Sequence, residues 1–95
     1  MHIISRKAIH LFAQIHPDSR VPLDTWFRIM QLGSFSSFHD LHQVFARADL
    51  VDGLVVFNIG GNKYRLIAAV HFNRQKVYIR HILTHTEYDR GGWKP

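Results

Sequence analysis

The sequence contains no cysteine, and no aspartate or glutamate occurs between Gly53 and Thr86. The absence of cysteine excludes disulfides, thiolate metal ligands and cysteine nucleophiles, so any chemistry must use oxygen and nitrogen side chains. No stretch approaches the roughly 18 apolar residues that a membrane span needs, and the charged N-terminus has no apolar core after it. We therefore expect a soluble, unexported protein of the reducing cytoplasm, with no membrane partner.

The chain of 95 residues, with 46% hydrophobic and 20% charged residues, suits a single globular domain over residues 1–95 with one modest core. Its net charge of +5 favours a polyanionic partner. The region without acidic residues carries five cations, which indicate a basic surface for a phosphate-rich partner such as RNA. A solvated basic surface without a specific partner is the alternative, and charge alone does not distinguish RNA from DNA. The five cations are Lys63, Arg65, Arg74, Lys76 and Arg80.

The N-terminal half has the spacing of helices. A short strand at residues 3–4 precedes a helix that Ser5 caps and Pro17 ends. A second helix has Pro22 in its first turn and ends at Gly33, where a left-handed cap is expected. A capping box at residues 37–40 begins a short third helix. The apolar positions are Ala8, Leu11, Phe12 and Ile15 in the first helix, and Leu23, Trp26, Phe27 and Met30 in the second.

After a turn at Asp52-Gly53 the pattern becomes that of β-structure. Apolar runs at residues 54–59, 64–72 and 77–83, joined by hairpin-length connectors, predict three antiparallel strands. Alternation in the second strand places Tyr64, Leu66, Ala68, Val70 and Phe72 on the face that the helices cover, and Arg65 on the other. Thr86 would cap a last helical turn, and residues 90–95 read as a tail. These elements predict an α+β fold.

Several kinds of active site lack support in the sequence. His39 and His42, and likewise His81 and His85, have spacings that suit a metal, but neither pair has a third ligand at a motif spacing. We therefore expect no metal and no cofactor. The serines lie in a turn where capping explains them, and the acidic residues are scattered, so neither a serine triad nor a carboxylate pair is indicated.

Three side chains near the basic sheet, Arg65, His85 and Tyr88, could together cleave RNA without a metal. A base would remove the proton of the RNA 2′-hydroxyl, a cation would stabilise the extra negative charge that develops on the phosphate oxygens, and an acid would protonate the departing 5′-oxygen. Histidine as a residue type suits proton transfer near neutral pH, and the arginine fork matches two phosphate oxygens. Spacing leaves open the structural alternatives: a solvated Arg65, a packing His85, and a Tyr88 that covers the core.

Strict alternation along the third strand creates a conflict, because it places Arg80 and His85 on opposite faces of the sheet. We expect the strand to end by about Leu83, so that the chain turns His85 back toward the face of Arg65. Thr84 and Thr86, which flank His85, suit such a boundary.

The motifs of the C-terminal half resemble those of the HigB toxins of bacterial type II toxin–antitoxin modules. The similar runs are Val56-Phe57-Asn58-Ile59-Gly60-Gly61-Asn62-Lys63-Tyr64-Arg65-Leu66, Gln75-Lys76-Val77-Tyr78-Ile79-Arg80 and Thr84-His85-Thr86-Glu87-Tyr88-Asp89. These toxins belong to the RelE-like group. The resemblance implies two N-terminal helices packed on a small antiparallel sheet of three to four strands. It also implies cleavage of mRNA, in many members on the translating ribosome, and silencing by a HigA-like antitoxin with a helix-turn-helix domain.

The resemblance also suggests roles for individual residues. Arg65, in the Tyr-Arg-Leu signature, would hold the scissile phosphate; His85 would act as acid or base; and Tyr88 would act as a base or stack on a nucleobase. Because residues 54–59 lack the lysines that some relatives carry there, other cations would have to substitute. The predicted RNA-binding residues are Lys63, Lys76, Arg80 and Asn62.

We therefore predict a metal-independent endoribonuclease toxin that leaves 2′,3′-cyclic phosphate and 5′-hydroxyl ends. One alternative is a non-catalytic toxin of the same fold, comparable to those that inhibit gyrase. A plain RNA-binding module is another, and it would retain RNA without producing new ends.

Overall fold

The computed structural model describes residues 1–94 as five strands and four α-helices, with one 3-10 turn. The strands are β1 (His2–Ile4), β2 (Asp49–Val51), β3 (Leu54–Ile59), β4 (Tyr64–His71) and β5 (Lys76–Thr84). The helices are α1 (Arg6–Ile15), α2 (Arg20–Leu32), α3 (Phe38–Val44) and α4 (His85–Arg90), and the 3-10 turn η1 (Pro17–Ser19) connects α1 to α2. Among residues 1–94, no helix is both long and apolar enough to cross a membrane.

The strands form one sheet in the order β1-β5-β4-β3-β2. The predicted α+β class is confirmed, but the expected antiparallel sheet of three to four strands is corrected to a mixed sheet of five. The first strand, expected from its isoleucines, pairs in parallel with β5, with Ile3 opposite Val77. The additional strand β2 forms because the turn at Asp52 and Gly53, both with positive φ, closes a hairpin onto β3.

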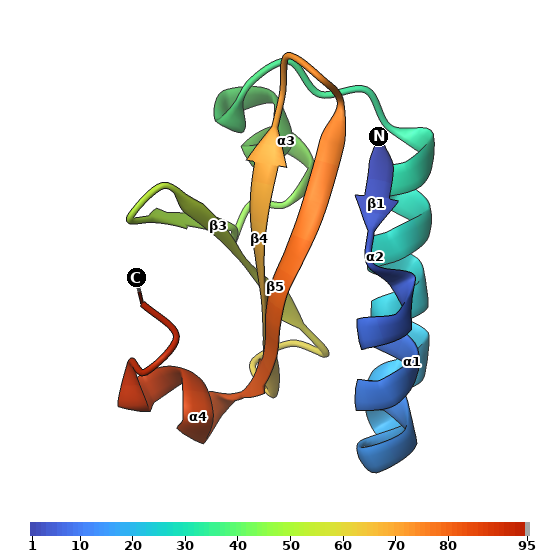
Figure 1. Ribbon diagram of the computed structural model, residues 1–95, viewed down its shortest axis with the longest axis vertical. Coiled ribbons are helices and arrows are strands. Elements are labelled where there is room, and N and C mark those ends of the chain that lie inside the picture. The colour runs from blue at the N-terminus through green and yellow to red at the C-terminus, as the bar shows by residue number, and fades with distance from the viewer. Residues whose placement is uncertain (95) are drawn as a thin grey trace.

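The main core lies between the sheet and the first three helices. Trp26 of α2 packs edge-on against Phe57 of β3, with ring centres 5.4 Å apart. Tyr64, Leu66 and Ala68 of β4 face this core, as alternation predicts. In Figure 1, α1 and α2 lie on one side of the sheet, and α4 and the C-terminus lie on the other. We call the face of the sheet opposite α1 and α2 the second face. Arg65 lies on it, because its neighbours Tyr64 and Leu66 face the main core.

The described part of the predicted tail, residues 90–94, does not lie free in solvent, and residue 95 lies outside the described residues. Trp93 is buried, at 7% exposure, and packs with Val56 and Ile67 in a small second core on the face opposite the helices. Leu83 and Tyr88 pack around this cluster. The expected open basic surface is therefore partly covered by α4 and the residues that follow it.

Two predicted helix caps need correction. Gly33 does end α2, as expected, but its backbone is not left-handed. Gly33 has an extended backbone (φ −80°), and glycine is required there because a side chain would collide with the ring of Phe35. Thr84, instead of Thr86, begins α4. Its hydroxyl accepts a hydrogen bond from the Glu87 N–H, and its own N–H donates to the Glu87 carboxylate. This capping box stops β5 and starts the helix at His85.

Candidate active site

The β3–β4 hairpin turns at Gly60 and Gly61, both with positive φ, and delivers Arg65 to the second face of the sheet. Arg65 lies opposite Asn58 of β3 and Leu83 of β5, so it is flanked by strands on both sides. Only 8% of the residue is exposed. The local sequence thus places a guanidinium in a largely desolvated position.

The Arg65 guanidinium folds back onto the turn and binds neutral oxygens. It donates to the Asn62 side-chain oxygen at 2.6 Å, to the Asn62 carbonyl at 3.3 Å and to the Tyr64 carbonyl at 3.1 Å. No acidic side chain pairs with it among residues 1–94. A buried charge without a counterion is costly. Arg65 is thus oriented by Asn62 and lacks an acidic partner among the described residues, so it is suited to bind an anion.

Helix α4 brings His85 close to the same turn. The His85 backbone N–H donates to the Lys63 carbonyl at 3.1 Å. Its Nδ1 lies 2.9 Å from the Asp89 carboxylate, one helical turn away, and its side chain is 41% exposed. Asp89 therefore binds the Nδ1 side of the imidazole, and Nε2 lies outside this pair. Sequence reasoning missed Asp89, although its i,i+4 spacing from His85 would have indicated the pair once a helix was assigned there.

Tyr88 connects α4 to Arg65. The guanidinium carbon of Arg65 lies 5.5 Å from the centre of the Tyr88 ring, within the range of a cation–π contact. Trp93 stacks on Tyr88 at 5.1 Å and 15°, and its indole N–H donates to the Tyr88 carbonyl at 3.0 Å. One face of the ring is thus occupied by Trp93. The structure therefore places Tyr88 against Arg65, and it places His85 at the start of the same helix, next to the turn that Arg65 binds.

The same capping box affects an acidic side chain beside His85. The hydrogen bonds from Thr84, first that of its backbone N–H, lower the pKa of Glu87 from its ordinary value. Glu87 is therefore more acidic than an unpaired glutamate, so it accepts the cap hydrogen bonds over a wider pH range.

The predicted RNA-binding cations occupy different places. Lys63 forms an exposed ion pair with Asp18 at 3.1 Å, and the Tyr64 hydroxyl donates to the same carboxylate. These hydrogen bonds, that of Tyr64 first, lower the pKa of Asp18, and the Asp18 carboxylate raises the pKa of Tyr64. Lys63 is therefore not the unpaired cation that the sequence suggested.

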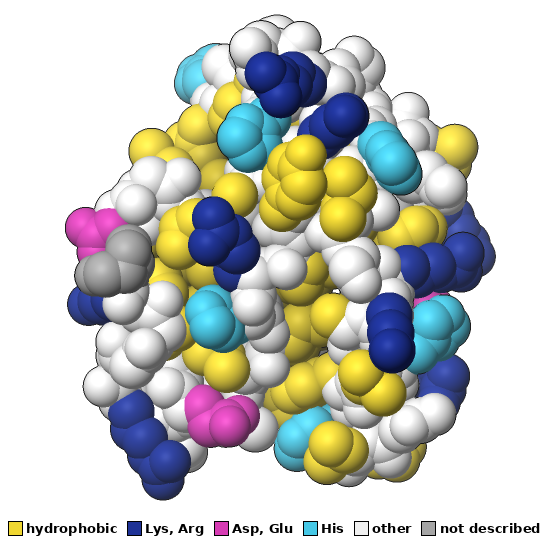
Figure 2. Space-filling view, viewed as in Figure 1, with side chains coloured by type: hydrophobic (Ala, Val, Ile, Leu, Met, Phe, Trp, Pro, Cys, Tyr) yellow, Lys and Arg dark blue, Asp and Glu magenta, His cyan; other side chains and the backbone are white. Residues whose placement is uncertain are grey.

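Lys76 lies at the opposite end of the β4–β5 ladder, where it faces His71. Six residues of strand separate His71 from Arg65, which is on the order of 20 Å. Figure 2 shows lysine and arginine side chains spread between hydrophobic patches on the face in view, rather than gathered in one patch. A contact between Lys76 and RNA, if made, is therefore distant from the phosphate that Arg65 would hold.

Arg80 is exposed and lies at an irregularity of β5. His81 pairs with Ile67, and Ile79 pairs with Ala68, so Arg80 is an extra residue between two paired positions. This bulge resets the alternation, which explains the conflict between Arg80 and His85 in the sequence. Among residues 1–94, no group of three potential ligands of the His, Asp or Glu type converges to hold a metal.

The sequence of this chain matches a known class of protein. Residues 19–91 match a family described as HigB toxin, the RelE-like toxic component of a toxin-antitoxin system. The chain therefore belongs to the HigB toxin family, as its motifs indicated.

Several curated relatives cover nearly the whole chain. The mRNA interferase toxin HigB of Escherichia coli K12 is 38% identical over 92 residues, which cover 94% of this chain and 88% of that protein. The mRNA interferase HigB of Shigella flexneri gives the same values. The mRNA interferase HigB of Escherichia coli O6:H1 is 29% identical over 93 residues, covering 95% and 90% of the two chains.

Proposed function

We propose that this protein is a metal-independent endoribonuclease that cleaves mRNA and so inhibits translation. The proposal is carried by Arg65, a desolvated cation whose only described partners are neutral oxygens and the Tyr88 ring. Such a group gains most from an anion, and its fork matches two phosphate oxygens. The relatives named mRNA interferases support RNA as the source of that phosphate.

In the proposed reaction Arg65 binds the scissile phosphate and stabilises the charge that develops on it. His85 Nε2 removes the proton of the 2′-hydroxyl, and the 2′-oxygen attacks the adjacent phosphorus. The bond between phosphorus and the 5′-oxygen breaks, and the Tyr88 hydroxyl supplies a proton to that oxygen. The products are a 2′,3′-cyclic phosphate and a 5′-hydroxyl, and proton exchange with solvent restores both side chains.

The proposed setting is the cytoplasm, where mRNA and the translating ribosome are present. The proposed silencing partner is a HigA-like antitoxin with a helix-turn-helix domain. Family membership supports an antitoxin in general. Acidic side chains on it would complement Arg65, which has no acidic partner among residues 1–94.

The test is cleavage of a defined mRNA by purified protein, both free and in a translating mixture, with mapping of the new ends. The expected result is 5′-hydroxyl and 2′,3′-cyclic phosphate ends in at least one of the two conditions, absent with Arg65→Ala. RNA retained without new ends would favour the RNA-binding alternative. Inhibition of growth without RNA cleavage would favour a non-catalytic toxin.

The role of metals is tested separately, since chelation also damages ribosomes. Transition metals are removed while magnesium is held at its normal concentration. We expect cleavage to persist, because Arg65, His85 and Tyr88 supply a cation and two proton-transfer groups. Loss of cleavage that zinc or manganese restores would contradict the metal-independent mechanism.

A further inference from the structure

Three consecutive carbonyls, which we call the hairpin carbonyls, connect the proposed active site to the β3–β4 hairpin. The carbonyls of Asn62 and Tyr64 accept hydrogen bonds from the Arg65 guanidinium, at 3.3 Å and 3.1 Å. The carbonyl between them, that of Lys63, accepts a hydrogen bond from the backbone N–H of His85 at 3.1 Å. The position of Arg65 relative to His85 therefore depends on how the hairpin carbonyls are held.

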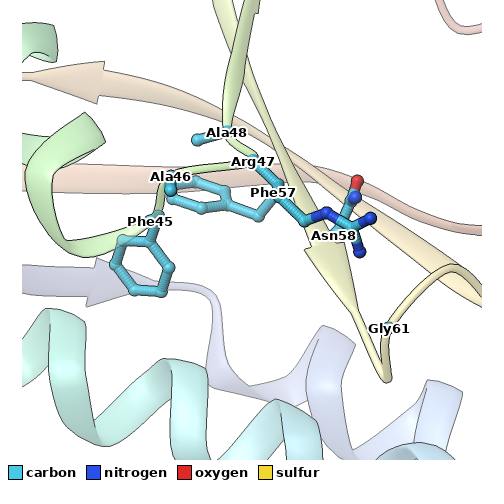
Figure 3. Close-up of a pocket in the computed structure, with 7 residues that line it drawn as sticks. All are labelled: Phe45, Ala46, Arg47, Ala48, Phe57, Asn58 and Gly61. Carbon is cyan, nitrogen blue, oxygen red and sulfur yellow. The ribbon is translucent and has the colours of Figure 1, made fainter.

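The core gives the turn of this hairpin little support. One cavity of about 330 Å³ lies beside the turn, and another of about 350 Å³ lies between the turn and α2. Gly61 lines both cavities, and Figure 3 shows it at the end of the hairpin, apart from the rings of Phe45 and Phe57. Groups that line a cavity lack packing partners on that side. Another constraint must therefore fix the hairpin carbonyls.

Asp18, in the 3-10 turn η1, supplies such a constraint. One oxygen of its carboxylate accepts a hydrogen bond from the Tyr64 hydroxyl at 2.6 Å. The other oxygen lies 3.1 Å from the Lys63 ammonium. Because Lys63 and Tyr64 are consecutive residues, a single carboxylate restrains two successive positions of the hairpin. Hydrogen bonds to an ionised acceptor are also stronger than those between neutral groups.

The element that carries Asp18 is itself well fixed. The hydroxyl and the backbone N–H of the buried Ser19 both donate to the His16 carbonyl, at 2.6 Å and 2.9 Å. The Tyr64 ring contacts the same end of α1, since its centre lies 5.2 Å from that of Phe12 and 5.3 Å from that of His16. Asp18 therefore projects from a rigid turn, and packing directs the Tyr64 hydroxyl toward it.

We propose that Asp18 is a positioning residue for RNA cleavage. By binding the side chains of Lys63 and Tyr64 together, it fixes the hairpin carbonyls, and these carbonyls set the separation between Arg65 and His85. Repulsion between like charges keeps Asp18 away from the RNA phosphate, so it acts only through the hairpin. Misplacement of a reacting group by about 1 Å can lower a rate about 10²-fold. This inference rests on the proposed function, which assigns Arg65 and His85 to the reaction.

The first test separates RNA binding from the chemical step. Asp18→Asn keeps the size of the side chain, removes its charge and frees the Lys63 ammonium. We expect the cleavage rate of the folded variant at saturating RNA to fall about tenfold to 10²-fold. The RNA concentration that gives half the maximal rate should not rise, because the variant is more positively charged than wild type.

The matched control is Asp24→Asn. It removes the same charge from α2, where Asp24 forms no ion pair with another of residues 1–94. Circular dichroism confirms that each variant is folded under the assay conditions. The control should keep both the maximal rate and the half-saturating RNA concentration of wild type.

A double-mutant cycle tests whether Asp18 acts through the hairpin. Tyr64→Phe removes only the hydroxyl that Asp18 binds and keeps the ring that packs against Phe12. Groups that act as a unit give effects that do not add. The double variant should therefore cleave no more slowly than Asp18→Asn alone. Effects of the two substitutions that multiply would overturn the proposal, because Asp18 and Tyr64 would then act independently.

The third test does not depend on cleavage. The backbone N–H of His85 donates to the Lys63 carbonyl, so its exchange with deuterium, followed by NMR, reports on the hairpin carbonyls. In Asp18→Asn we expect this exchange to be about fivefold faster than in wild type. The amides that pair β1 with β5, at the far end of the sheet, should be accelerated less. Equal acceleration at both places would overturn the proposal, because Asp18 would then only stabilise the whole fold.

The remaining outcomes separate the two proposals. Faster exchange at His85 in Asp18→Asn, together with a wild type that never cleaves RNA, would contradict the proposed function and leave the constraint on the hairpin in place. A folded Asp18→Asn that cleaves at the wild-type rate would overturn the positioning role alone. A higher half-saturating RNA concentration with an unchanged maximal rate would also overturn it, because Asp18 would then serve RNA binding.

Discussion

The guanidinium carbon of Arg65 lies 5.5 Å from the centre of the Tyr88 ring, which in turn stacks on Trp93 at 5.1 Å. Arg65 belongs to β4, whereas both aromatic residues follow the last strand. The position of the proposed phosphate-binding group therefore depends on packing between the sheet and the segment that covers its second face. Substitutions in that segment are therefore expected to affect the position of Arg65.

Replacing Arg65 with alanine should reduce cleavage by about 10²–10³-fold, the usual loss when one preorganised charge donor is removed. The fold should persist, because the lost hydrogen bonds are confined to oxygens of the neighbouring residues Asn62 and Tyr64. Cleavage rates with circular dichroism as the folding check test this expectation. Arg74→Ala is the matched control, and a folded Arg65→Ala protein as toxic as wild type would show that the assignment is wrong.

His85→Gln should lower the cleavage rate by about 10²–10⁴-fold while RNA or ribosome binding is retained, because proton transfer acts in the transition state. Asp89→Asn should have a much smaller effect. Exposed pairs contribute about 0.2–1 kcal/mol, so a loss of no more than about fivefold is expected. Parallel loss of binding and rate for His85→Gln would instead identify a contact residue.

Trp93→Ala should reduce both stability and cleavage. Removing a large buried aromatic side chain typically costs about 3 kcal/mol, and here it would also release Tyr88 from one side. Trp93→Phe should restore most of both properties, because it keeps the stack but loses the hydrogen bond to the Tyr88 carbonyl. Unfolding midpoints and cleavage rates of the two variants are compared. Full activity of Trp93→Ala would show that the segment after α4 does not position Arg65.

Lys76→Ala should leave the rate at saturating RNA within about twofold of wild type. Because Lys76 lies at the far end of the ladder from Arg65, its charge can assist binding but not the chemical step. The measurement is cleavage at low and high RNA concentration over a range of salt. A large loss at saturating RNA would contradict this expectation, because it would mean that Lys76 acts in the chemical step despite its distance from Arg65.

Acid should destabilise wild type more than Asp18→Asn. The pKa of Asp18 is lowered in the folded protein, first by the Tyr64 hydroxyl and then by Lys63. A lowered folded-state pKa gives stabilisation that is present above the ordinary aspartate pKa and is lost as the pH falls through the folded-state value. The gap between the two unfolding midpoints should therefore be fully present at neutral pH and should begin to narrow as the pH falls below about 4. A gap that does not change with pH would mean that the charge of the Asp18 carboxylate does not contribute to stability.

Local patterns in the sequence predicted the central hairpins well. The strand at residues 54–59 is confirmed at both ends, and the core face of β4 follows the alternation of Tyr64, Leu66 and Ala68. Glycine-rich turns fix the register of adjacent strands, so these features depend only on neighbouring residues. The third strand was expected to end by about Leu83, and β5 ends one residue later, at Thr84.

Features that depend on distant partners could not be predicted. The bulge at Arg80 is visible only in the pairing of β5 with β4, and the parallel pairing of Ile3 with Val77 joins opposite ends of the chain. The burial of Trp93 depends on Val56 and Ile67, far away in the sequence. Lys63 and Asp18 are similarly brought together by the tertiary fold.

The order of the elements along the chain determines when the Arg65 environment forms during synthesis. All five strands leave the ribosome before α4 and Trp93, which cover the second face of the sheet. A nascent chain that has emerged only as far as β5 would lack the contact of Arg65 with Tyr88 and the cover that Trp93 gives to the sheet. The proposed active site is thus completed only after residues beyond Tyr88 have left the exit tunnel.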